Sequence, residues 1–160
     1  METILFYPVY LLIGIIFTLI LIPQKDYKEY FIYGFTLGAL GDIIVVTLFQ
    51  DLFHVMCFKN LGFFNVLGQH ALSPPSWAVT MMLFLRFLPE RRPFLYLYLV
   101  TFAAFSIGYG YILSNLGLLG FRPWFYPIAA YGVFLGWWST AAWIFKKTSS
   151  FTDNKSLLKN

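Results

Sequence analysis

Residues 30–50 read YFIYGFTLGALGDIIVVTLFQ, and Asp42 is the one charged residue in this long apolar stretch. A helix needs about 20 such residues to cross the hydrocarbon core of a bilayer. Four further apolar runs flank this stretch, and short segments that carry most of the charge separate them. The five predicted spans are residues 4–23, 30–50, 74–88, 94–114 and 125–145. The sequence therefore predicts an all-α, polytopic membrane bundle of five transmembrane helices.

The composition agrees with a bilayer as the main solvent of this chain. Hydrophobic residues make up 59% of the sequence and charged residues only 11%. A soluble domain carries about 25% charged residues, so this chain has too few polar groups to cover its surface in water. The aromatic share of 22% is typical of membrane proteins, because Trp and Tyr favour the two headgroup levels. We expect the lipid bilayer to be the principal partner.

The distribution of basic residues predicts the orientation. If the N-terminus lies outside, only Lys59 and Arg122 of the 11 basic residues lie on the outer side. The inner segments then hold the remaining nine, which are Lys25, Lys28, Arg86, Arg91, Arg92, Lys146, Lys147, Lys155 and Lys159. Short cytoplasmic loops are enriched in Lys and Arg, so we predict a multi-pass protein of the cell membrane with a cytoplasmic C-terminus. The net charge of +4 reports topology, and no nucleic-acid partner is expected.

Domain organisation follows from the same pattern. Residues 1–145 are predicted to form one bundle, and residues 146–160 a flexible cytoplasmic tail. Segment 51–73 mixes phenylalanines with glycines and polar residues, which favours a partly helical cap at the outer interface. The first run lacks a positively charged start and a cleavage site, so we expect it to remain as a helix.

The third run is short for a span. Residues 74–88 rise only about 22 Å as a helix. Either the bilayer thins locally, or the helix continues past Leu88, or the preceding cap fills the gap.

Small residues recur at helical spacing in three of the predicted spans. Such residues allow neighbouring helices to approach closely in lipid. The predicted packing positions are Gly34, Gly38, Gly41, Ala104, Gly108, Gly132 and Gly136. They can be used within one bundle or between chains, so a homo-oligomer and a membrane partner subunit both stay open.

Asp42 is the main candidate functional residue. An ionised carboxylate near the bilayer centre costs roughly 2.5–3.5 kcal/mol on insertion scales. Asp42 follows Gly38 by one helical turn, so it is expected to point into the bundle. It is either protonated and bonded to a hydroxyl, or ionised and paired with Arg86. The pair requires the third helix to extend to about Arg92; otherwise Arg86 reaches the inner headgroups.

A second candidate group lies in the outer segment. Asp51, His54 and His70 would be sufficient for general acid–base chemistry or for part of a metal site. Their spacing matches no metal-ligand signature, and Cys57 is the sole cysteine, so neither a metal nor a disulfide is expected. We interpret these residues as headgroup contacts, and we predict no cofactor.

Several of these features together resemble a family of short, uncharacterised integral membrane proteins of Bacillota. They are Glu29-Tyr30 leading into Gly34, Gly38 and Asp42, then Pro74-Pro75-Ser76-Trp77, then Leu88-Pro89 before a basic turn. The resemblance covers about residues 20–145. It implies no activity and no catalytic residues, because the family carries none that could be transferred.

The leading functional hypothesis is a non-catalytic membrane protein that binds a lipid or another hydrophobic ligand, or serves as an assembly subunit. One alternative is a membrane enzyme for lipid or isoprenoid substrates that uses Asp42 or the group of Asp51, His54 and His70. Another is a small transporter or proton-coupled channel centred on Asp42. The remaining aromatic residues are assigned to the lipid-facing surface and the interfacial belts, with a pocket for an isoprenoid or a lipid chain lined by Tyr109, Tyr111 and Tyr126 as the alternative.

Overall fold

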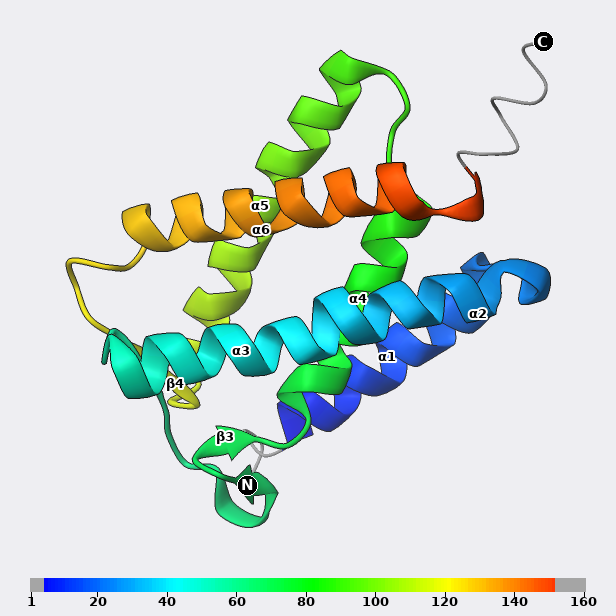
Figure 1. The fold of residues 1–160 in the computed structure, drawn as a ribbon. Helices are drawn as coiled ribbons and strands as arrows, with labels where there is room; N and C mark the ends of the chain where they lie inside the picture. The colour runs from blue at the N-terminus through cyan, green and yellow to red at the C-terminus, as the bar shows by residue number, and fades with distance from the viewer. Residues whose placement is uncertain (1–4, 152–160) are drawn as a thin grey trace, which may run out of the picture.

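The computed structural model describes residues 5–151 and is mostly helical (Figure 1). The helices are α1 (Phe6–Leu21), a long helix over Gln24–Leu52, α4 (Ser73–Arg86), α5 (Arg92–Asn115) and α6 (Ile128–Thr148). They occupy the places of the five predicted runs, so the all-α prediction is confirmed.

The long helix is built from four consecutive segments. These are α2 (Gln24–Tyr33), the π-helical η2 (Gly34–Leu40), α3 (Gly41–Thr47) and the π-helical η3 (Leu48–Leu52). Pro23 precedes the first turn and Asp26 lies within it, where a negative charge interacts well with the helix dipole. The helix therefore begins before residue 30, the predicted start, and Asp42 lies in its second half, on the side of the cap.

The apolar surface faces outward, as in a membrane protein. Among the described residues, three helices are long and apolar enough to cross a bilayer: Gln24–Leu52, Arg92–Asn115 and Ile128–Thr148. Helix α1 is also apolar, and it buries Tyr7, Gly14 and Thr18. Its exposed residues include Leu12, Ile13, Ile16, Leu19 and Ile20. A helix on the surface of a soluble protein would show the reverse distribution.

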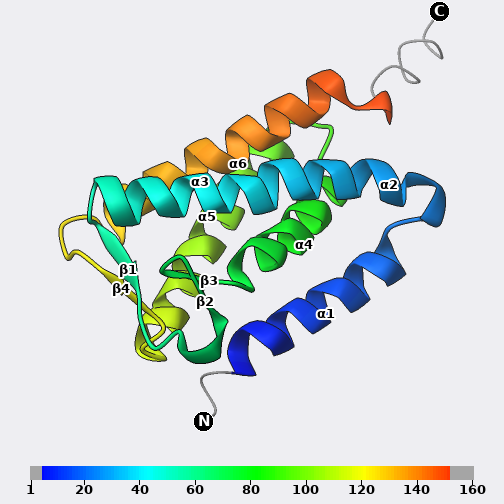
Figure 2. The ribbon, with the colours of Figure 1, turned by 60° about the horizontal axis from the view of Figure 1, so that its bottom comes forward.

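Helix α4 lies in the middle of the bundle, with α1 on one side and the long helix on the other (Figure 2). Its buried residues point in several directions and include Ser76, Val79, Met81, Met82, Phe84 and Leu85. It ends at Arg86, so it does not extend to Arg92. The shortest apolar run is thus the one that other helices surround.

Segment 51–73 forms a cap of short strands and turns, in which residues 51–52 belong to the end of the long helix and residues 62–64 form a 3₁₀ turn, so only a small part of it is helical. Strand β1 (Met56–Phe58) pairs antiparallel with β4 (Leu119–Phe121), which joins the two loops at this end of the bundle. Strand β2 (Asn65–Val66) pairs with β3 (Gln69–His70), and the short 3₁₀ turn η4 (Gly62–Phe64) precedes β2. Strand pairing satisfies backbone groups that an apolar interface would leave unbonded. Strand β3 leads directly into α4, so the cap fills the gap beyond this short helix.

The tip of the cap lies beside the long helix. Gln50 donates a hydrogen bond to the carbonyl of Gly68 at 3.1 Å, and Gln69 donates to the hydroxyl of Thr47 at 2.9 Å. Phe63 and Leu67, close to this tip, are 97% and 94% exposed. These side chains suit the headgroup region better than bulk water.

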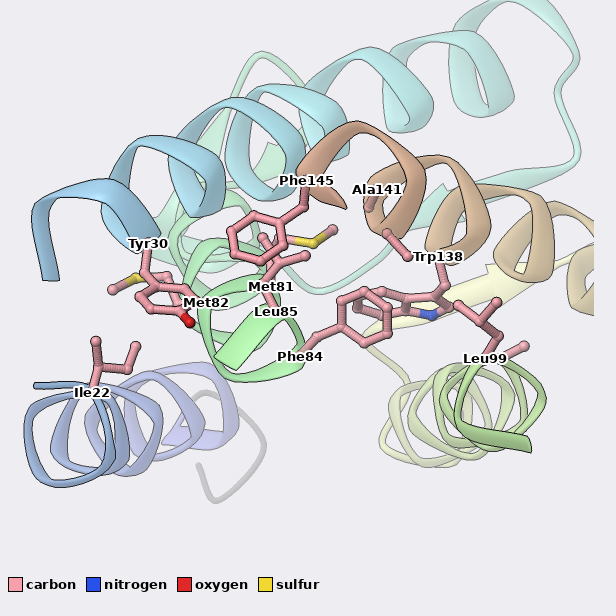
Figure 3. Close-up of a cluster of buried hydrophobic side chains, with 12 residues drawn as sticks. Ile22, Tyr30, Met81, Met82, Phe84, Leu85, Leu99, Trp138, Ala141 and Phe145 are labelled. Atoms are coloured by element: carbon pink, nitrogen blue, oxygen red, sulfur yellow. The ribbon is translucent and has the colours of Figure 1, made fainter. Parts of the chain in front are cut away.

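The largest apolar core connects α4, α5 and α6 (Figure 3). Trp138 is fully buried, and its ring lies 4.5 Å from that of Phe84. Its indole Nε1 donates to the hydroxyl of Ser106 at 3.0 Å. A buried indole N–H needs such a partner, so this bond fixes how α6 packs on α5.

The opposite end of the bundle holds the beginning of the expected tail. Helix α6 continues through Lys146 and Lys147 to Thr148. Glu29 accepts hydrogen bonds from the backbone N–H and the hydroxyl of Ser150. The tail predicted from residue 146 therefore begins as packed structure, and residues 152–160 lie outside the described residues.

The predicted small-residue positions divide into two groups. Gly34 and Gly38 pack against the backbone of α4, and Gly41 packs against the ring of Trp137. The remaining four face outward in the described part of the chain. Ala104, Gly108, Gly132 and Gly136 are exposed, and a Cβ built on each of these three glycines would meet no atom within 4 Å. Helices α5 and α6 bury other residues, including Ala103 and Trp138, so packing between chains stays a prediction for these four.

We predict that Gly38→Ala destabilises the protein by about 1–3 kcal/mol, the usual cost of overpacking. The new Cβ would lie 2.5 Å from the carbonyl oxygen of Trp77 and 2.8 Å from Cα of Ala78, and neither backbone atom can rotate away. Gly132→Ala is the matched control, because its Cβ meets open space and alanine favours the helix by about 1 kcal/mol. Thermal unfolding of both variants in detergent measures the difference. Equal stability of the two would contradict the close contact at Gly38.

Candidate functional site

Asp42 lies where the long helix meets the start of α4. It is in the first turn of α3, directly after the π-helical segment η2. Its carboxyl group is adjacent to the hydroxyl of Ser73, the first residue of α4. The oxygen Oδ2 is buried, and it has no hydrogen-bond partner among residues 5–151. The site therefore contains an acidic oxygen that the fold leaves unsatisfied.

Asp42 and Arg86 do not form the ion pair that the sequence left open. Arg86 is the last residue of α4, whereas Ser73, the neighbour of Asp42, is the first. The two ends of this helix are about 20 Å apart at 1.5 Å per residue. The Nε of Arg86 donates instead to the carbonyl of Leu21 at 3.0 Å. The sequence placed Asp42 and Arg86 at a similar depth in the bilayer, and this prediction is wrong. The long helix begins earlier than expected, so Asp42 lies closer to the cap.

Two tyrosines from other helices complete the polar group around Asp42. Tyr7 of α1 is 1% exposed, and its hydroxyl lies near those of Ser73 and Tyr109. Tyr109 of α5 is also buried, and its hydroxyl approaches Tyr7 without completing a hydrogen bond. For Tyr109 the preferred lipid-facing assignment is wrong, and the alternative that it lines a pocket agrees with the structure. Sequence reasoning missed Tyr7 and Ser73 as well; the available signal was a hydroxyl inside or at the edge of an apolar run.

These polar groups lie at a cavity of about 90 Å³. A cavity needs only about 10–15 Å³ of such space to hold one water molecule, so this one has room for several non-hydrogen atoms. Its wall is predominantly apolar and contains many aromatic side chains. Lining residues from the helices include Gly38, Val45, Phe49, Trp77, Phe134 and Trp137. Met56, Phe58, Leu119 and Phe121, from β1 and β4, also line the cavity, so the two-stranded ribbon forms its wall at the cap end.

The second predicted group is not assembled. His70 is buried, whereas Asp51 and His54 are exposed. The Nδ1 of His54 lies 2.9 Å from the carbonyl oxygen of Gln50, which fixes this ring on its own loop. Within residues 5–151, no three or more His, Cys, Asp or Glu side chains are grouped so that they could hold a metal ion. Asp51, His54 and His70 therefore do not form a shared acid–base or metal site.

His70 supports the cavity from the cap. Its ring stacks on Tyr7 at 3.9 Å and on Phe64 at 5.2 Å. Its Nδ1 accepts a hydrogen bond from the backbone N–H of Leu72 at 3.2 Å, which requires an unprotonated Nδ1. Burial lowers the pKa of His70, because the charged ring would lose its hydration. Neutral His70 thus holds Tyr7 in place beside Ser73.

We predict that His70 makes stability depend on pH. Its pKa is lower in the folded chain than the usual value of about 6.5, so below pH 6.5 the unfolded chain binds a proton that the folded chain resists. The free energy of unfolding is therefore highest above pH 6.5 and falls as the pH drops toward the folded-state pKa. Chemical unfolding in detergent between pH 7.5 and 5 measures this loss.

The variant His70→Asn is expected to remove most of this pH dependence, since its side-chain oxygen can accept the same hydrogen bond without titrating. His54→Asn is the control and should keep it. A pH profile that is unchanged in His70→Asn would show that other groups are responsible.

Comparisons with protein-family models, with curated proteins and with solved structures found no match. The resemblance to the Bacillota family stays a prediction, and the functional argument depends on the geometry of this chain.

Proposed function

We propose that this chain is a five-span protein of the plasma membrane that binds a lipophilic small molecule in the cavity beside Asp42. Three of the helices are long enough to cross a bilayer by themselves. Helices α1 and α4 are shorter, with 16 and 14 residues. Helix α4 is lengthened by the cap, and α1 exposes a continuous apolar surface, which supports their inclusion as spans.

The proposed orientation has the cap outside and the C-terminus in the cytoplasm. Contacts bring the helix ends opposite the cap together: Arg86 reaches Leu21, and Lys146 donates to the carbonyl of Pro89 at 2.9 Å. The described basic residues at this end are Lys25, Lys28, Arg86, Arg91, Arg92, Lys146 and Lys147. Lys59 and Arg122 are the two that lie at the cap end. The positive-inside rule supports this orientation.

Cys57 provides a direct test of orientation. It is exposed on β1 and is the single cysteine of the chain. We expect a membrane-impermeant maleimide to label it in intact cells. In the double variant Cys57→Ser/Lys28→Cys, labelling should require permeabilised cells. The opposite result for both proteins would reverse the proposed topology.

The unsatisfied polar atoms in an apolar cavity carry the proposal of ligand binding. Small-molecule sites are typically apolar concavities with a few placed polar groups. Here Oδ2 of Asp42 and the hydroxyl of Tyr109 have no hydrogen-bond partner, and both residues line the cavity. A buried acceptor without a donor costs about 1–3 kcal/mol or more. A ligand that supplies a donor would recover this free energy.

The alternative functions have weaker support. An enzyme that uses Asp51, His54 and His70 would need these side chains to face one site, whereas His70 is buried and the other two are exposed. A transporter usually needs several polar positions along its path, whereas the cavity wall is mainly apolar. Assembly with a second chain stays a prediction for the outward faces of α5 and α6, where Gly108 and Gly132 are exposed.

We predict that n-hexanol or n-hexylammonium raises the melting temperature of the purified protein in detergent. A six-carbon chain is slender, and its head with the first methylenes fits a space of about 90 Å³. Val45→Phe should abolish the rise, because Val45 lines the cavity and the larger ring fills it.

Ile44→Phe is the matched control, since Ile44 is 59% exposed on the same helix. It should respond to the probes as the natural protein does. No rise with either probe, or an equal rise in Val45→Phe, would overturn the proposed binding site.

A further inference from the structure

We propose that the ligand of this cavity is a lipophilic organic ammonium ion. This inference depends on the proposed function, because it specifies the chemistry of the molecule bound beside Asp42. It is argued from the charge of the site, from its aromatic walls and from its hydrogen-bonding groups.

The acidic group of the site has no cationic side chain beside it within the described chain, so an ionised Asp42 would lack a counter-charge. The carboxyl group of Asp42 has Ser73 as its polar neighbour, and its Oδ2 is buried without a partner. The cavity lining includes no Lys or Arg side chain. Arg86, the cation that the sequence suggested, is bonded at the far end of α4. A cationic ligand would therefore supply the counter-charge that this carboxylate lacks.

The same charge pattern excludes acidic ligands. A fatty-acid carboxylate or a lipid phosphate would meet Asp42 in a low-dielectric environment, where like charges repel strongly. Sites for such anions usually contain Arg, Lys or several backbone N–H groups. Among the described residues, the cavity lining includes neither Arg nor Lys. The choice thus lies between a neutral alcohol and an ammonium ion.

The aromatic walls favour the ammonium ion. Trp77, Tyr109, Phe134 and Trp137 all line the cavity. Trp77 stacks on Phe134 at 5.8 Å and meets Tyr109 edge-on at 5.9 Å, so rings of different orientation surround the space. A cation near an aromatic face is attracted by the ring, and the attraction is stronger when both are desolvated. A neutral hydroxyl gains no comparable attraction.

The available acceptors also match an ammonium head. A primary ammonium offers three N–H donors and no acceptor. Asp42 Oδ2, the Tyr109 hydroxyl oxygen and the Ser73 hydroxyl oxygen are acceptors from three different elements at one region of the cavity. An alkanol offers one donor, so it can donate to only one of these three oxygens, although its own oxygen can accept from a hydroxyl. Charge, rings and acceptors therefore point to the same class of ligand.

The experiment compares n-hexylammonium chloride with n-hexanol, which have the same chain and differ in the head group. Dissociation constants are measured by titration of the purified protein in a non-ionic detergent. We expect the ammonium to bind at least tenfold more tightly. Asp42→Asn keeps the size of the side chain and removes its charge, so it should lower ammonium binding to the level of hexanol and leave hexanol little changed. Asp51→Asn is the control for a general loss of negative charge and should keep the preference.

The outcomes separate the two proposals. Equal binding of the two probes by the natural protein would overturn the ammonium inference and leave the binding site standing. The same holds if Asp42→Asn retains the preference for ammonium. Binding of neither probe would overturn the proposed function itself. The comparison in the natural protein decides the matter even if Asp42→Asn does not fold.

Discussion

The close contact between the long helix and α4 determines most of the structure. Gly34 and Gly38 have no side chains, so backbone approaches backbone at the centre of the bundle. Without a hydrophobic driving force between helices in lipid, such packing is a main source of association. One helical turn after Gly38, the same approach brings Asp42 to Ser73. The position of the Asp42 carboxyl group thus depends on glycine at positions 34 and 38.

The sequence predicted the helices well, because apolar length is a strong local signal. It also placed Asp42 on the face of Gly38, since both are set by helical periodicity. It did not predict that Tyr7, Ser73 and Tyr109 meet at this carboxyl group. These residues come from three separate elements, and no local pattern encodes their contact. The start of the long helix was placed too late, because its first turns are polar and resemble a loop.

The cap shows a different limit of sequence reasoning. Asp51, His54 and His70 were a candidate acid–base or metal group, because all three lie in the segment between the second and third predicted helices. The chain instead ends a helix at Leu52 and forms a hairpin before His70. His70 then turns inward, where it stacks on Tyr7, while Asp51 stays outside. Proximity in a loop is a weak guide, because a single tight turn can send neighbouring side chains in opposite directions.

The ribbon of β1 and β4 has a consequence for how a ligand would arrive. Its residues Phe58 and Phe121 form part of the cavity wall at the cap end, so a molecule that came from that end would have to pass their rings. A guest molecule would then enter sideways, from among the acyl chains. Its effective concentration would be set by partition into the bilayer, where amphiphiles accumulate. A modest affinity of the cavity for the ligand would then be enough to fill it. The lipid composition would change the occupancy, because it changes how much ligand the bilayer holds.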